Sequence, residues 1–312
     1  QVLETLQGDC NEHTVLFVAM AIVIFMVVAF RNQAGRIERC MESLVKHHAA
    51  HDYGVVLIDD ASEDDCLDLA RAVLSRHGKP FVAVRNASRK FYTRNLYNAV
   101  HLLCTRDDAI VLEVDGDDFL EDRDVLSVLD AAYREGCLQT FGRFRCGPGR
   151  DRFPGVDFLE RTDLAECFDW GAPWDLDRCF SWMHLKTFQR KLFTAVPLVY
   201  FLERDTREWL RSGEDMIIHP KMSELAGERV RYIDEELYVY DFTGTDHEIL
   251  WNEQAEYLLS KLYRLPVGSH FGYLRECVQE RALRRHMDAL EAQGETLPVE
   301  QQRARMPLTA TR

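Results

Sequence analysis

The chain has little of what marks several other classes of protein. Its 312 residues include no low-complexity stretch, which argues against a disordered chain, and no internal repeat. Its net charge is −14, and it has no basic stripe of the kind that a nucleic-acid surface requires. We therefore expect no nucleic-acid partner. Whole-chain charge says little about any one cleft, so a nucleotide ligand stays open.

Cysteine is present but lacks the spacing of a metal or disulfide framework. The nine cysteines are scattered, odd in number and without a Cys-x-x-Cys pair. They are Cys10, Cys40, Cys66, Cys104, Cys137, Cys146, Cys167, Cys179 and Cys277. Zinc ligation and a disulfide framework are therefore poorly supported, and a reducing, cytoplasmic compartment fits the pattern best.

No apolar stretch is comfortably long enough to span a membrane. Residues 14–30 carry no charge, but this length is at the short limit for a transmembrane helix. The alternative is that residues 22–30 form a core strand after a short arm. We favour the strand, because the stretch runs directly into a loop and an amphipathic helix, as the first strand of an α/β sheet does. A single-span anchor at 14–30 is the less favoured alternative, and peripheral membrane association stays open.

An acidic cluster, Asp115-Gly116-Asp117-Asp118, follows the apolar run 109–112. The apolar run predicts a buried strand, and carboxylates at the end of a buried strand are costly unless something neutralises them. Divalent cations such as Mg²⁺ and Mn²⁺ prefer carboxylate oxygens and often share them with phosphates. A second apolar run, 55–58, ends in Asp59-Asp60. The two runs together predict a metal–diphosphate site.

The first half of the chain alternates between strand and helix patterns. Strands are expected at 24–30, 55–58, 81–85 and 109–114, and helices at 35–47, 64–77, 94–104 and 123–135. This order predicts an α/β fold with a mostly parallel central sheet and helices on both faces. Ligands of such sheets bind outside the carboxyl ends of the strands, where Asn32, Asp60, Asp115 and Asp117 fall.

The second half is less regular. Strands are expected at 138–145, 230–233 and 238–241, and a helix at 214–225. Residues 168–193 are rich in aromatics and suggest a binding wall. From residue 248 onward the pattern is helical and charged, which predicts a C-terminal helical extension.

Four of these segments, taken in order, resemble the motifs of one enzyme family. FMVVAFRNQAGRIERCMESL resembles the opening strand, turn and helix of family 2 glycosyltransferases, which have the GT-A fold, and VVLIDDASEDD resembles their nucleotide-binding strand. VLEVDGDDFLEDRDVL resembles their Asp-x-Asp motif, and Gly213-Glu214-Asp215-Met216 their Glu-Asp motif. The resemblance covers residues 22–247. It implies an N-terminal arm at 1–21, a Rossmann-like GT-A domain at 22–247 and a helical extension at 248–312.

The resemblance also implies roles for individual residues on the donor side. It assigns Asp117 and Asp115 to a divalent cation, Mn²⁺ or Mg²⁺, with His247 as a candidate third ligand. Asp60 is expected to accept a hydrogen bond from a uracil ring N–H. The residues assigned to nucleotide-sugar binding are Ala29, Asn32, Asp60, Arg94, Asp115, Gly116 and Lys186.

On the acceptor side, the resemblance assigns Asp215 as the general base and Glu214 as its partner. Trp170 and Trp174 are expected to stack on a sugar. Structural alternatives stay open for these acids: Glu214 and Asp215 suit the first turn of any helix. Asp59 and Asp60 equally suit helix capping together with Ser62.

The resulting expectation is an inverting, metal-dependent glycosyltransferase. It would move a sugar from a nucleotide donor, most readily a UDP-sugar, to a hydroxyl of a glycan or lipid-linked acceptor. The alternatives are a catalytically silent GT-A-like binding subunit, a nucleotidyltransferase of related fold and a phospho-receiver module. The second lacks a Gly-rich, basic triphosphate loop near the first strand, and the third leaves half the chain unexplained. Oligomer formation stays open.

Overall fold

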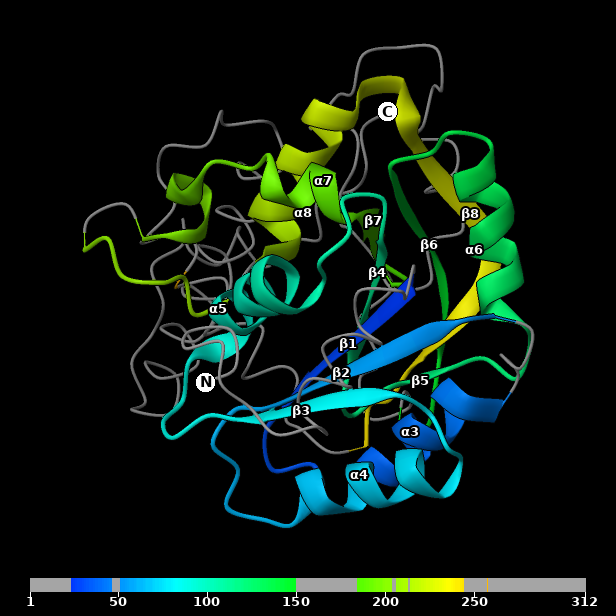
Figure 1. Ribbon diagram of the computed structural model, residues 1–312, viewed down its shortest axis with the longest axis vertical. Coiled ribbons are helices and arrows are strands. Elements are labelled where there is room, and N and C mark those ends of the chain that lie inside the picture. Colours follow the sequence, from blue (N-terminus) through cyan, green and yellow to red (C-terminus); the bar gives the residue numbers. More distant parts are fainter. Residues whose placement is uncertain are drawn as a thin grey trace, which may run out of the picture.

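The described part of the chain is built around one mixed sheet (Figure 1). The structure is a computed structural model that describes residues 24–46, 51–149, 184–203, 206–212, 214–243 and Tyr257, with the backbone alone at 214–216. The arm at 1–21 and the extension at 248–312, apart from Tyr257, lie outside these residues. So do Trp170 and Trp174, which are expected to stack on a sugar, and His247, the candidate metal ligand. The three domain ranges therefore stay predictions.

The elements alternate as the first half of the sequence predicts. The strands are β1 Ile24–Phe30, β2 Tyr53–Asp59, β3 Phe81–Arg85, β4 Ile110–Asp115, β5 Phe119–Leu120, β6 Gln139–Cys146, β7 Thr187–Gln189 and β8 Val230–Tyr240. The helices are α3 Ile37–Lys46, α4 Cys66–Arg76, α5 Phe91–Asn98, the π-helical turn η1 Ala99–Leu103, α6 Val125–Arg134, α7 Arg190–Thr194, the 3-10 turn η5 Leu198–Phe201, α8 Glu214–Ala226 and the turn η6 Gly227–Arg229.

Strand β1 shows how the sequence builds two cores. Its alternate residues Met26 and Val28 join one apolar cluster with α3, α4 and α6. Phe25 and Val27 join a second cluster with α5, α7 and α8 on the opposite face. Alternate side chains of a strand point to opposite faces, so a strand that is apolar throughout is buried from both sides. Figure 1 shows α3 and α4 on one side of the sheet and α5, α7 and α8 on the other.

The strand order is β3-β2-β1-β4-β7-β6-β8-β5. The neighbours β3, β2, β1 and β4 are parallel, as are β6 and β8, whereas β7 and β5 run antiparallel to their neighbours. The register places Phe30 beside Asp59 and Ala29 beside Asp115. The carboxyl ends of β2, β1 and β4 therefore meet at one edge, which confirms the predicted mostly parallel sheet and the predicted approach of the two acidic motifs.

Some boundaries differ from the sequence prediction. The helix expected at 94–104 is α5 followed by the π-helical turn η1, and β5 and β7 were not predicted at all. The two strands expected at 230–233 and 238–241 form one strand, β8, which continues through Asp234, Glu235 and Glu236. The acidic stretch is accommodated because β8 bulges opposite Arg143 of β6: Gly142 pairs with Ile233 and Arg143 with Glu236, so Asp234 and Glu235 are extra residues on β8. The Arg143 guanidinium lies 3.8 Å from Asp234 and 3.6 Å from Glu236.

The apolar segment at 14–30 is described only from residue 24, where it is the buried central strand β1. Among the described helices, none has the length and apolar character that a membrane crossing needs.

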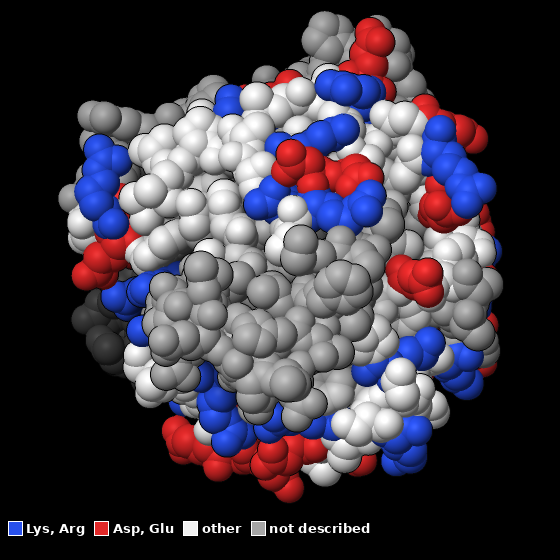
Figure 2. Space-filling view, in the orientation of Figure 1, with Lys and Arg blue, Asp and Glu red and all other residues white. Residues whose placement is uncertain are grey.

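Charge on the visible face is mixed. Figure 2 shows Lys and Arg side chains next to Asp and Glu side chains over much of the described part of that face. The described residues include exposed ion pairs such as Arg106–Asp108 at 2.7 Å and Arg231–Glu135 at 2.6 Å. Exposed pairs of opposite charge contribute little to stability, about 0–1 kcal/mol each.

The turn after β4 depends on a close contact with β1. Gly116 is buried, and a Cβ built on it would lie 2.5 Å from Cβ of Phe30. The atom it would meet belongs to the base of a buried side chain and cannot rotate away. The glycine is therefore required by packing against β1, in addition to any approach of a ligand.

We expect Gly116→Ala to destabilise the protein by about 1–3 kcal/mol, the usual cost of overpacking. Chemical denaturation followed by circular dichroism measures this loss. Gly35→Ala is the matched control, because nothing lies within 4 Å of its Cβ position. Equal stability of the two variants would show that the turn adapts to the added carbon.

Candidate active site

Asp60 anchors the loop between β3 and α5. Its Oδ1 accepts hydrogen bonds from the Asn86 amide at 2.9 Å and from the backbone N–H of Lys90 at 2.7 Å. Its Oδ2 accepts from the backbone N–H of Phe91 at 2.9 Å. Burial on its own raises the pKa of the Asp60 carboxyl, but these bonds and one from Asn95 outweigh it and lower the pKa. Asp60 is therefore held as a carboxylate.

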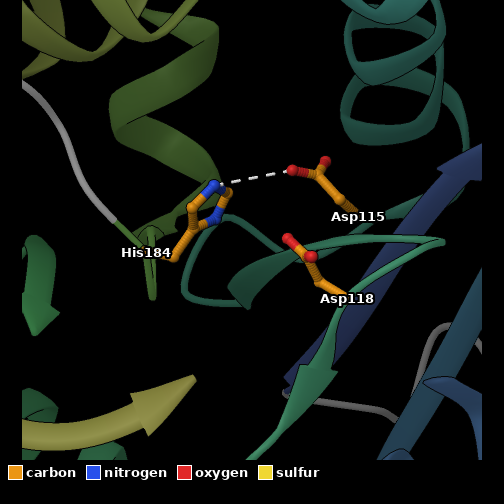
Figure 3. A group of neighbouring side chains, drawn as sticks. All are labelled: Asp115, Asp118 and His184. Atoms are coloured by element: carbon orange, nitrogen blue, oxygen red, sulfur yellow. Dashed lines mark ion pairs between the residues drawn. The ribbon is translucent and has the colours of Figure 1, made fainter. Parts of the chain in front are cut away.

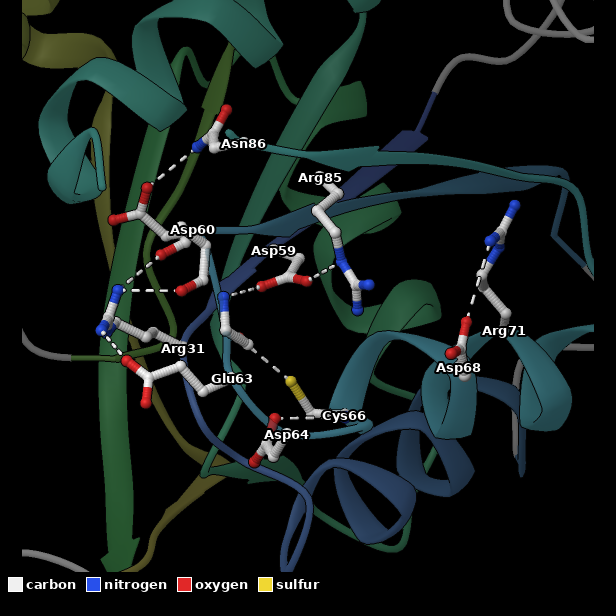
Figure 4. Close-up of polar contacts among 12 residues, drawn as sticks. Arg31, Asp59, Asp60, Glu63, Asp64, Cys66, Asp68, Arg71, Arg85 and Asn86 are labelled. Atoms are coloured by element: carbon white, nitrogen blue, oxygen red, sulfur yellow. Dashed lines mark hydrogen bonds and ion pairs between the residues drawn. The ribbon is translucent and has the colours of Figure 1, made fainter. Parts of the chain in front are cut away.

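Asp59 is fully buried and serves the fold. It accepts the backbone N–H of Ser62 at 2.8 Å and the guanidinium Nε of Arg85 at 2.6 Å (Figure 4). The predicted capping of α4 by Ser62 is wrong: the residue preceding α4 is Asp65, and the Ser62 hydroxyl instead accepts the backbone N–H of Asn32 at 3.0 Å.

Asn32 links the ends of β1 and β2. It has a positive φ of 53°, a conformation that Asn tolerates better than most residues. Its Oδ1 accepts the backbone N–H of Glu63 at 2.9 Å. Arg31 adds bonds to the carbonyls of Asp60 and Ala61, as Figure 4 shows. The contacts described for Asn32 hold the loop, and its predicted role toward a nucleotide stays a prediction.

The turn after β4 holds its carboxylates in different surroundings. Asp118 is buried, and its oxygens accept the hydroxyl of Tyr238 at 2.9 Å and the backbone N–H of Asp241 at 2.7 Å. Burial and the nearby Asp117 and Asp115 raise the pKa of Asp118 well above its usual value. Accumulated negative charge at this turn is thus the main electrostatic feature of the site.

His184 meets this turn from the neighbouring strand segment. The oxygens of Asp115 and Asp118 and an imidazole nitrogen of His184 lie within 4.8 Å of one another, and His184 Nε2 lies 3.5 Å from Asp115 Oδ2. Figure 3 shows the three side chains pointing toward one space. The His184 ring stacks on Tyr238 with centroids 4.4 Å apart.

This donor set fits a divalent cation. Two carboxylates suit Mg²⁺ or Mn²⁺, and the imidazole favours a transition-metal ion such as Mn²⁺. Asp115 is the predicted ligand that the cluster contains. Asp117, also predicted, lies outside this group of three and faces Arg36, whose Nη1 is 3.8 Å from its Oδ2.

Three further residues predicted to bind the nucleotide sugar differ in how deeply they are buried. Lys186 is buried, with its Nζ 3.9 Å from Glu113 Oε2. Arg94, on α5, is partly exposed and lies over the ring of Trp209 at 5.6 Å. Ala29 is the partly buried residue of β1 that pairs with Asp115.

The predicted base is placed at the start of a helix. Glu214 and Asp215 are the first two residues of α8, which confirms the helix expected at 214–225. The same helix carries His219, which lies 2.9 Å from Glu113 in the interior.

Sequence reasoning missed three residues of this region: Glu113, His184 and His219. Glu113 could have been found from the sequence, because it is a single acidic residue inside an otherwise apolar strand. His184 falls in the stretch read as an aromatic wall, and no local pattern marks it or His219.

The sequence model of glycosyl transferase family 2 matches residues 25–192, more than half of the chain. The chain belongs to glycosyl transferase family 2. It is thus a glycosyltransferase, and the match favours this identity over the nucleotidyltransferase and receiver alternatives. A search of curated proteins finds no significant match.

Solved structures of similar fold agree with the family. TarS from S. aureus, crystallised as residues 1–349 with UDP-GlcNAc, matches with a TM-score of 0.56 and 15% identity, covering 91% of this chain and 78% of that one. The mannosyltransferase PcManGT from Pyrobaculum calidifontis, in complex with GDP-Man and Mn²⁺, matches with a TM-score of 0.61 and 17% identity, covering 90% and 77%. At these identities the likeness shows the GT-A fold.

We expect Asp60→Asn to loosen the loop that Asp60 anchors in this family 2 enzyme. An amide presents N–H groups to donors that need an acceptor, which costs about 1–3 kcal/mol. Hydrogen exchange at the amides of Lys90 and Phe91 should rise. Because the folded pKa of Asp60 is lowered, its contribution is present above the unfolded pKa of about 3.9 and is lost as pH falls through the folded value. The stability gap between wild type and variant should therefore narrow in acid; a gap independent of pH would contradict this assignment.

Proposed function

We propose that the chain is an inverting, metal-dependent glycosyltransferase that takes a UDP-sugar as donor and a hydroxyl of a glycan or lipid-linked molecule as acceptor. The observation that carries this proposal is the cluster of Asp115, Asp118 and His184 at the carboxyl edge of the sheet. Asp60 lies at the same edge, two strands away. The two similar structures, one with UDP-GlcNAc and one with GDP-Man and Mn²⁺, support a nucleotide-sugar donor.

The residues that would hold the cation are Asp115, Asp118 and His184, with Asp117 and His247 retained as ligands from the family resemblance. When bound, the cation neutralises the charge of the leaving nucleoside diphosphate. Arg36 would help to position the Asp117 carboxylate, because its Nη1 lies 3.8 Å from Asp117 Oδ2.

For the nucleotide, Asp60 is proposed to accept the ring N–H of uracil. The Asn86 amide, the backbone N–H groups of Lys90 and Phe91, and Asn95 keep Asp60 in its charged form, and a carboxylate is a suitable acceptor for such an N–H. The diphosphate contact is proposed for Arg94 rather than Lys186, because the ammonium of Lys186 is buried against Glu113 whereas Arg94 is partly exposed. Ala29, Asn32 and Gly116 would complete the wall at the ends of β1 and β4.

For the acceptor, Asp215 is proposed as the general base and Glu214 as its partner. Inversion requires one carboxylate that takes the proton of the acceptor hydroxyl while its oxygen attacks the anomeric carbon opposite the diphosphate. The start of α8 supplies two acids for this role. Trp170 and Trp174 are proposed to stack on the acceptor sugar.

A thermal-shift screen tests the donor and the metal together. A ligand that binds the native state raises the melting temperature by mass action. We expect UDP with Mn²⁺ to raise it, and UDP with a chelator to have little effect. A larger shift with GDP would transfer the proposal to a GDP-sugar, and no shift with any nucleotide would overturn it.

We expect His184→Ala and Asp117→Ala to weaken Mn²⁺-dependent UDP binding by at least about tenfold, which corresponds to about 1.4 kcal/mol. Calorimetric titration of UDP into each variant with Mn²⁺ measures this. Asp130→Asn is the control, because this residue lies on α6 and pairs with Arg134 at 2.8 Å. Unchanged affinity in His184→Ala would remove His184 from the ligand set.

We expect Asp215→Asn to keep UDP–Mn²⁺ affinity and to lose turnover by about 100-fold or more, the scale of general-base catalysis. UDP release from UDP-GlcNAc, used as the probe donor with water as the acceptor of the sugar, measures turnover. Normal turnover of Asp215→Asn would exclude it as the base.

A further inference from the structure

Glu113 is a buried carboxylate at the meeting point of four elements. It lies on β4 and is almost fully buried. The hydroxyl of Tyr92 on α5 donates to its Oε2 at 2.8 Å. Nε2 of His219 on α8 lies 2.9 Å from its Oε1, and Nζ of Lys186, next to β7, lies 3.9 Å from its Oε2.

The proposed chemistry makes no direct use of these groups. Glu113 and His219 are too deeply buried to touch a substrate. Burying such a pair is costly, and apolar side chains of similar volume often give equal or greater stability. A gain in stability therefore explains this buried Glu–His contact poorly. A role in fixing how the surrounding elements are arranged explains it better.

The position of the pair indicates which arrangement it controls. Glu113 precedes Asp115 by two residues on β4, so both side chains point to the same face of the sheet. His219 follows Asp215 by four residues on α8, so both lie on the same face of the helix. The contact thus joins β4, which carries Asp115, to α8, which carries Asp215. The two residues in contact are neighbours of the residues proposed to react and do not react themselves.

Helix α8 needs such an external link, because Pro220 lies inside it. Proline has no N–H to donate to the carbonyl of Met216, and proline in a helix interior weakens or bends the helix. Hydrogen bonds from side chains hold this part of the helix in addition to its own backbone hydrogen bonds. The amide of Gln139 on β6 donates to the His219 carbonyl at 3.2 Å, and the Ser223 hydroxyl donates to Gln139 Oε1 at 2.6 Å.

The geometry of the pair is consistent with a fixed contact. Nε2 of His219 faces Oε1 of Glu113 at 2.9 Å, which is within hydrogen-bonding distance. The other ring nitrogen lies 3.5 Å from the Gln139 amide.

We infer that Glu113 and His219 are positioning residues that fix α8, and with it the proposed base, against the strand that carries Asp115. This inference rests on the proposed function of Asp215. A displacement of about 1 Å between reacting groups costs on the order of 100-fold in rate. The pair should therefore affect turnover far more than donor binding.

The test compares Glu113→Gln, His219→Leu and the conservative His219→Gln, which keeps an N–H donor. Tyr53→Phe is the matched control: its buried hydroxyl bonds the Leu44 carbonyl at 2.8 Å, at the opposite end of β2 from the site. Three quantities are measured for each: UDP–Mn²⁺ affinity, UDP release from UDP-GlcNAc at saturation and hydrogen exchange across the chain.

We expect Glu113→Gln and His219→Leu to release UDP about 100-fold more slowly with UDP–Mn²⁺ affinity unchanged. His219→Gln should recover part of the rate. Amide exchange should rise in residues 217–226 of these variants and not in Tyr53→Phe. Rates equal to the control, or joint loss of UDP binding and turnover, would overturn the inference.

Failure of the proposed function is distinguishable from failure of this inference. If the wild type neither binds UDP–Mn²⁺ nor releases UDP, the proposed donor is wrong. Hydrogen exchange still decides the role of the pair: a rise confined to α8 supports it, and no rise or a rise across the whole chain overturns it.

Discussion

The structure depends on how negative charge is compensated at one edge of the sheet. Parallel strands bring their carboxyl ends together, and here those ends carry acids. Each acid is met differently: Asp59 by Arg85, Asp60 by backbone N–H groups, Asp117 by Arg36 and Asp241 by Arg39. Asp115 and Asp118 converge with a histidine, whose charge depends on pH. This graded compensation keeps the fold stable while retaining an acidic centre suited to a cation.

Much of this arrangement was predictable because it is local in sequence. The apolar runs that became β1, β2 and β4 end in polar residues, and parallel pairing follows from their alternation with helices. The proximity of Asp60 to Asp115 needed no further information. Family motifs then supplied the chemistry, and the family is confirmed by the match over 25–192.

The rest could not be read locally, because it depends on pairing between distant segments. Lys186 faces Glu113 and His184 faces Asp115 through the antiparallel pairing of β7 with β4, and β7 is only three residues long. Ser62 was expected to cap α4, but the positive φ of Asn32 turns its N–H toward the Ser62 hydroxyl. The buried contact between Glu113 and His219 joins two elements that are far apart in the sequence, and no periodic pattern of residues indicates it.

The short strand β7 also limits which changes of chain length the enzyme can tolerate. Side chains alternate across a strand, so a shift by one residue reverses which of them point to a given face. Insertion or deletion of a single residue between His184 and Thr187 would replace His184 or Lys186 with Leu185 on the face of Asp115 and Glu113. The contact of His184 with Asp115 and that of Lys186 with Glu113 would be lost in the same event, although no acidic residue had changed. Length variation in the family is therefore expected in the loops that flank this segment and not within it.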